Sequence, residues 1–96
     1  MNLKMLSKND LLTSTEKLVV EERRITSQIL WHLYEIERRR LFAELGFASL
    51  FEYATVQLKY SAGSAQRRIS AMRLLREMPD VASKIDSGEL KIELLV

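Results

Sequence analysis

Apolar residues in the first third of the chain recur at helical spacing. They form one stripe, with steps of seven, seven, four, four and three residues, made of Leu11, Leu18, Ile25, Ile29, Leu33 and Ile36. This pattern predicts one long helix over residues 10–40, after a flexible N-terminus over residues 1–9. Because such a helix is much longer than the average of roughly 11–12 residues, we expect its stripe to contact more than one partner, such as the same helix of a second chain.

Shorter helices with clear boundary residues are predicted after the long one. Gly46 is placed to stop a short apolar turn. Ser49 and Glu52 have the spacing of a capping box, and Phe47 and Tyr53 are placed as the hydrophobic staple across it. The helix that begins at Ser49 is expected to end at about residue 58.

A second capped helix follows closely, with Ser61 as its cap. Two capped helices joined by a short turn form a helix-turn-helix. The predicted segments are the helix-turn-helix 49–77, a helix 79–87 that Pro79 starts and Gly88 closes, and the start of a further helix at 90–96. The fold class is therefore all-α, a long N-terminal helix followed by a bundle of short helices, with residues 10–96 as a single domain.

Composition removes several classes of protein. The chain has no cysteine, which rules out disulfides and thiolate metal sites. It contains no run of 18 apolar residues that would predict a membrane span, and its N-terminus lacks the apolar core of a signal peptide. We expect a cytoplasmic protein of bacterial type, with no cofactor and no metal.

Charge is distributed unevenly, although the formal net charge is only +2. No aspartate or glutamate occurs between Tyr53 and Arg76. The same stretch carries five cations, Lys59, Arg67, Arg68, Arg73 and Arg76. A local positive field of this kind favours nucleic acid as the partner.

The helix after Ser61 separates apolar from polar side chains. At 100° per residue, Ala62, Ala65, Ile69 and Met72 share one side. The N-terminal half of such a helix enters the major groove, and here its other side carries small or hydrogen-bonding residues, Gly63, Ser64, Arg67 and Ser70. The helix 62–76 is therefore the expected contact with duplex DNA.

Each cation in and near this helix has an expected role. Arg67 is the candidate for a base edge, because its fork matches both guanine acceptors. Phosphate contacts, which position without specifying sequence, are expected from Lys59, Arg68, Arg73, Arg38, Arg39 and Arg40. The amides after Ser61 add one more. The alternative is that the arginines form the solvated face of an ordinary bundle; the gap in acidic residues and the two caps favour DNA.

Several stretches resemble the N-terminal helical region that precedes HNH nuclease domains in some bacterial proteins. They are Leu18–Arg23, Ile36–Leu41, Glu44–Tyr53, and Tyr60–Ser61 with Ala65–Ile69, and the similarity covers about four-fifths of the chain. The part after Ser61, including Arg73–Leu75, Met78–Pro79 and Gly88–Leu90, also looks like the helix-turn-helix of ParB-type partition proteins. Both resemblances imply DNA as the partner.

The chain departs from the family pattern at three points. Lys59 replaces the usual turn glycine, so a lysine must adopt a left-handed conformation there or the turn must differ. Lys91 replaces the usual serine or threonine cap. The nuclease motif itself is absent, since the chain has one histidine. Any cleavage activity that the resemblance implies would belong to a further C-terminal domain.

Other candidate chemistry has a plainer interpretation. His32 has Glu35 one turn away but no nucleophile or second ligand nearby, so we expect an interfacial or hydrogen-bonded histidine. Another candidate is a set of aromatic side chains on which the bases of single-stranded nucleic acid could stack. The six residues are Trp31, Tyr34, Phe42, Phe47, Phe51 and Tyr53. Their helical placement favours core packing. A protein-interaction or homodimerisation module, built on the long helix, is the alternative to DNA binding.

Overall fold

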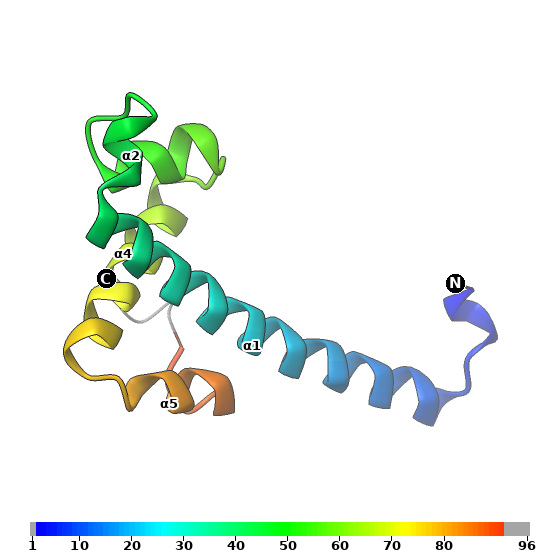
Figure 1. Ribbon diagram of the computed structural model, residues 1–96. Coiled ribbons are helices and arrows are strands. Elements are labelled where there is room, and N and C mark those ends of the chain that lie inside the picture. Colours follow the sequence, from blue (N-terminus) through cyan, green and yellow to red (C-terminus); the bar gives the residue numbers. More distant parts are fainter. Residues whose placement is uncertain (1, 92–96) are drawn as a thin grey trace.

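One helix runs the length of the molecule, and the shorter helices gather at one end of it (Figure 1). The computed structural model describes residues 2–91, in which all regular structure is helical. Helix α1 (Lys8–Arg39) has 32 residues, and at about 1.5 Å per residue it accounts for the 50 Å long dimension of the molecule. The predicted all-α fold with a long N-terminal helix is confirmed.

Helix α1 begins earlier than its apolar stripe indicates. The Ser7 hydroxyl accepts a hydrogen bond from the Asp10 amide at 3.1 Å and caps the helix, which starts at Lys8. A short 3₁₀ helix, η1 (Leu3–Met5), precedes it. The segment predicted to be flexible therefore contains η1 and the first two residues of α1. At the other end, Arg40 has φ 53° and closes the helix in the left-handed region, without a glycine.

Two short helices, α2 (Leu41–Glu44) and α3 (Leu50–Glu52), follow. The Ser49 hydroxyl accepts from the Glu52 amide at 3.0 Å, as the capping box predicts. The Glu52 carboxylate accepts from the Ala48 amide at 3.3 Å, one residue before the expected partner. The cap is therefore reciprocal, but its return bond ties down the chain just ahead of the helix.

The predicted helix to residue 58 changes geometry halfway. After α3 the chain forms a π-helical turn, η2 (Tyr53–Gln57). The Thr55 hydroxyl lies 3.1 Å and 3.2 Å from the carbonyls of Phe51 and Glu52, and a side chain placed there loosens the usual ladder. Lys59 then has φ 64°, which confirms that a lysine takes the left-handed turn position.

The two C-terminal helices are α4 (Ala62–Glu77) and α5 (Val81–Ser87). Ser61 caps α4 as predicted, with its hydroxyl accepting from the Ser64 amide at 3.1 Å. The expectation that Pro79 starts the last helix is wrong, because Pro79 lies in the turn whose carbonyl accepts from the Ala82 amide. Gly88 closes α5 with φ 84°. The further helix expected at 90–96 falls mainly on residues 92–96, which lie outside the described residues.

The core surrounds the C-terminal part of α1, which we call the inner segment (residues 26–39). Leu30 and Leu33 of this segment are buried against Met72 and Leu75 of α4. The same cluster includes Phe42, Leu50, Ile69, Ala71, Val81 and Ile85. Ser27 adds a polar contact, since its hydroxyl donates to the carboxylate of Asp86 in α5 at 2.5 Å. This end of the molecule therefore has a single core to which every helix after α1 contributes.

The N-terminal part of α1, the outer segment (residues 8–25), lies away from this core. Figure 1 shows it in blue, running out from the bundle toward the N-terminus. Three residues of the predicted stripe are exposed here, Leu11 at 40 %, Leu18 at 66 % and Ile25 at 49 %. The continuous stripe thus has two environments, and within the described chain only its C-terminal part is covered.

Candidate nucleic-acid interface

Helix α4 buries most of the side that its sequence predicts, since Ala65, Ile69 and Met72 are covered. It buries five side chains, Ala65, Ile69, Ala71, Met72 and Leu75. Its exposed side chains include Ala62, Gln66, Arg73 and Arg76, with Gly63 beside them. Because α4 packs against both α1 and α5, its buried arc is broad and includes Ala71. Ala62, which was placed on the apolar side, is exposed at the first position of the helix.

Arg67 and Ser64, expected at the centre of the outward side, lie at its margin and are half-buried. Nη2 of Arg67 is 3.5 Å from the Ser64 hydroxyl. A Cβ atom added at Gly63 would lie 3.3 Å from Nη1 of Arg67. Both contacts are within α4, so the guanidinium lies along the first turn of its own helix. Glycine at position 63 leaves the space in which it rests.

Arg68 has an internal role. Its guanidinium stacks on the Tyr60 ring, 4.4 Å from the centroid, and donates to the Ser64 carbonyl at 3.2 Å. A cation–π contact of this kind contributes about 0.5–1 kcal/mol at an exposed site. Arg68 therefore fastens the turn to α4, and its charge stays near the start of the helix.

Arg73 and Arg76 both contact one carboxylate on α1. Arg73 Nη2 and Arg76 Nη1 each lie 3.3 Å from an oxygen of Glu37. These pairs join the inner segment of α1 to α4. They also neutralise part of the positive charge of the acid-free stretch 53–76. The glutamate that does so lies outside this stretch, at position 37, so the local sequence does not reveal it.

The arginine run at the end of α1 is similarly engaged. Arg38 and Arg39 both donate to Glu35, Arg39 Nε at 2.6 Å. The hydrogen bonds from Arg38 and then Arg39 lower the pKa of Glu35 to about 2, and Glu35 in turn raises the pKa of Arg38. The Arg40 guanidinium lies 5.3 Å from the centroid of the Phe42 ring. This cluster carries less available charge than its sequence indicates.

The exposed surface at the start of α4 has a residue that the sequence prediction did not include. Gln66 is exposed, between Gly63 and Ser70 on the outward side. Lys59 is also exposed and precedes the cap, whereas Ser70 is half-buried. The sequence feature that could have identified Gln66 as an interface residue is its uncharged polar side chain in a helix of mostly apolar and basic residues. The simple helical wheel missed it because it assumed that Ile69 marks the centre of the buried side.

The remaining candidate groups have local roles. His32 Nδ1 donates to the Gln28 carbonyl at 2.6 Å, one turn earlier, so the expected hydrogen-bonded histidine is confirmed. Among the residues that the structure describes, no group of three or more histidine, cysteine or acidic residues is placed to hold a metal ion. Of the six aromatic residues only Phe42 is buried, while Phe47 and Tyr53 pack edge to face at 5.8 Å as the expected staple.

Comparisons with known proteins supply no relative. No family model matches the chain, and neither a curated protein nor a solved structure matches it. None of the helices in the described chain is both long and apolar enough to cross a membrane.

Proposed function

We propose that this protein binds duplex DNA through the exposed side of α4. The observation that carries the proposal is a capped helix, preceded by a short turn, whose first two turns expose Ala62, Gly63 and Gln66. Small side chains around one exposed amide allow close approach to base edges in a major groove. Because the proposed partner is DNA, we also propose that the protein is located in the cytoplasm of a bacterial cell.

Two kinds of contact are assigned to different residues. Gln66 reads a base, since its amide can bind N6 and N7 of adenine together, and Arg67 is the nearest guanidinium at the margin of the same surface. Lys59 and Arg73, on either side of that surface, contact phosphates. Arg73 does so by exchanging its ion pair with Glu37 for a phosphate. Ser61 and the first amides of α4 are placed for one more phosphate.

The test is a salt titration of binding to duplex and single-stranded DNA, followed by selection of a preferred duplex from a random pool. Gln66→Ala is expected to relax preference at one base position, by about 1–3 kcal/mol. Arg73→Ala is expected to weaken all duplexes alike and to reduce the salt slope by about one.

Matched controls are available for both variants. Gln57→Ala removes an exposed glutamine from η2, and Lys84→Ala removes an exposed cation from α5. Neither is expected to change binding. Salt-independent binding, or equal effects of Gln57→Ala and Gln66→Ala, would contradict the proposal.

We propose in addition that the chain acts as the non-catalytic helical region of a protein of HNH-nuclease type. The resemblance described above supports this. The chain alone is expected to leave supercoiled plasmid intact in the presence of divalent metal. Metal-dependent nicking by the purified chain would contradict this assignment.

A further inference from the structure

The outer segment of α1 exposes more apolar surface than a solvated helix needs. All six of its large apolar side chains are exposed, Leu11, Leu12, Leu18, Val19, Val20 and Ile25. Three of them, Leu11, Leu18 and Ile25, are seven residues apart, which places them on one line along the helix. Contiguous apolar surface of this kind marks an interaction site.

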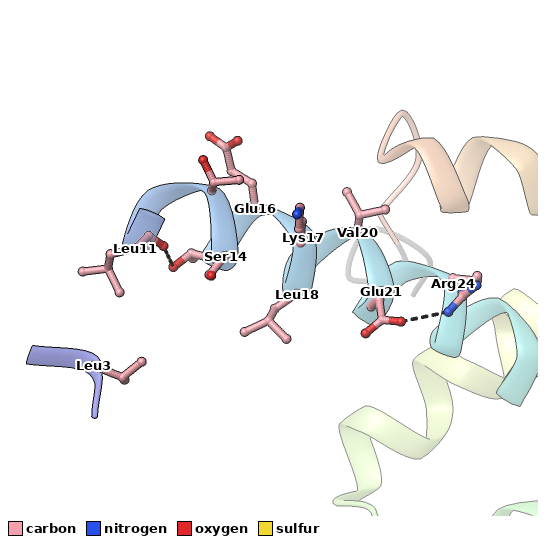
Figure 2. Close-up of a pocket in the computed structure, with 11 residues that line it drawn as sticks. Leu3, Leu11, Ser14, Glu16, Lys17, Leu18, Val20, Glu21 and Arg24 are labelled. Atoms are coloured by element: carbon pink, nitrogen blue, oxygen red, sulfur yellow. Dashed lines mark hydrogen bonds and ion pairs between the residues drawn. The ribbon is translucent and has the colours of Figure 1, made fainter. Parts of the chain in front are cut away.

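A hollow lies along this line. Its volume is about 940 Å³, and Leu3, Leu11 and Leu18 are among the residues that line it. Figure 2 shows Leu11 and Leu18 on the side of α1 that faces Leu3, while Val20, which also lines the hollow, extends from another side of the helix. A second hollow of about 430 Å³ continues along the same line, bounded by Ile25, Ile29 and Ile36. The two hollows share no lining residue but both lie along α1, and together they are called the groove.

We propose that a second copy of this chain occupies the groove, with its own α1 running antiparallel. The outer segment carries four basic and four acidic residues, Lys8, Lys17, Arg23 and Arg24 against Asp10, Glu16, Glu21 and Glu22. Its net charge is therefore zero, so two copies approach without electrostatic repulsion. A strongly basic or acidic partner gains nothing from such a surface.

Charge complementarity supports the antiparallel orientation. At 100° per residue, Asp10 and Arg24 lie on one flank of the Leu18 line. In an antiparallel pair centred on Leu18 the same flanks of the two helices meet. Asp10 of each copy then lies about 3 Å along the axis from Arg24 of the other, so two pairs of opposite charge form.

The same register also satisfies the apolar residues. Centring the pair on Leu18 places Leu11 of each copy against Ile25 of the other. The first turns of one helix then reach the second hollow of its partner, next to Ile29. Both hollows are then occupied, and the two bundles lie at opposite ends of the pair.

Sedimentation over a wide range of concentration tests the association. The mass is expected to rise from 11.2 kDa to twice that value. Leu18→Glu is expected to hold the protein at the monomer mass, whereas Leu12→Glu, the same change at an exposed position that lines neither hollow, leaves the dimer intact. Circular dichroism of both variants checks that they are folded. A monomer mass at every concentration, or equal loss with Leu12→Glu, would overturn the proposal.

Cysteine cross-linking tests the orientation without depending on the charged variants. Because the chain has no cysteine, each introduced thiol is the sole one. A mixture of Leu11→Cys and Ile25→Cys chains is expected to give the mixed disulfide dimer under mild oxidation, and Leu18→Cys to cross-link with itself. Rapid self-cross-linking of Leu11→Cys alone would show a parallel pair and overturn the antiparallel one. DNA binding by α4 stands or falls separately, since the DNA titration does not involve these variants.

Discussion

The outer and inner segments of α1 have similar sequences and opposite surroundings. Each carries six large apolar or aromatic residues on one continuous helix. The inner segment buries Leu30 and Leu33 completely or nearly so, while Leu18 of the outer segment is 66 % exposed. Apolar periodicity thus predicts that a helix forms and which of its sides is apolar. It does not determine whether the covering surface belongs to the same chain.

The comparison also separates two kinds of charge. In the inner segment Glu35 and Glu37 each hold two arginines, and Glu37 connects α1 to α4. In the outer segment the ion pair is a local one, between Glu21 and Arg24 at 2.9 Å. Charges near the core thus join elements, and charges on the projecting helix remain available to a partner.

The largest expected difference comes from the same substitution made in each segment. Leu33→Ala removes a buried side chain and is expected to cost about 2–5 kcal/mol in the free energy of unfolding. Leu18→Ala, at concentrations where the protein is monomeric, is expected to change it by less than about 0.5 kcal/mol. Urea unfolding of both variants measures the difference. Equal losses would show that the outer segment is covered within the monomer.

Hydrogen exchange sharpens the same comparison along the backbone. Amides of the inner segment are expected to exchange only through global unfolding, at about 5–15 kcal/mol for a domain of this kind. Amides of residues 10–20 should exchange through local opening, at a free energy several-fold smaller. If the second copy binds as proposed, protection of the outer segment rises with protein concentration. Uniform protection of α1 in dilute solution would break the comparison.

A smaller effect is expected from Glu37→Gln. Its ion pairs with Arg73 and Arg76 are partly exposed, so stability should fall by no more than about 1 kcal/mol. If α4 binds DNA, the two released arginines make the salt slope steeper by about one to two. Glu22→Gln removes the same charge from the outer segment and serves as the control. Equal slopes for the two variants would exclude Glu37 as a competitor for these arginines.

The smallest effect is the pH dependence contributed by Glu35. Its pKa is about 2 in the folded protein, against 4.5 for the free side chain. Between these values the unfolded chain binds more protons, so the contribution of Glu35 to stability is complete above about pH 4.5 and is lost as pH falls toward 2. The stability difference between wild type and Glu35→Gln should shrink over that window. A constant difference, or one that grows on acidification, would contradict the assignment.

Local features of the fold were accessible from the sequence because they depend on near neighbours. The Ser49 and Ser61 caps and the glycine stops at Gly46 and Gly88 follow from residues within four positions, whereas the left-handed Lys59 was one of two outcomes that the resemblance implied. Where prediction of local structure failed, hydrogen bonding at the boundary was the reason. Ser7 began α1 before its apolar stripe, and the turn at Pro79 delayed α5.

The candidate interface depended on contacts that no local pattern contains. Glu37 meets Arg73 and Arg76 across more than thirty positions of sequence, and packing of α4 against two helices placed Gln66 outward and Arg67 at the margin. The sequence by itself determined the helices, their caps and the apolar stripe, because these arise from backbone hydrogen bonds and side-chain spacing within a few residues. The tertiary structure alone decided which part of that stripe is buried and which arginines are neutralised, since burial and ion pairing require groups distant in sequence to meet in space.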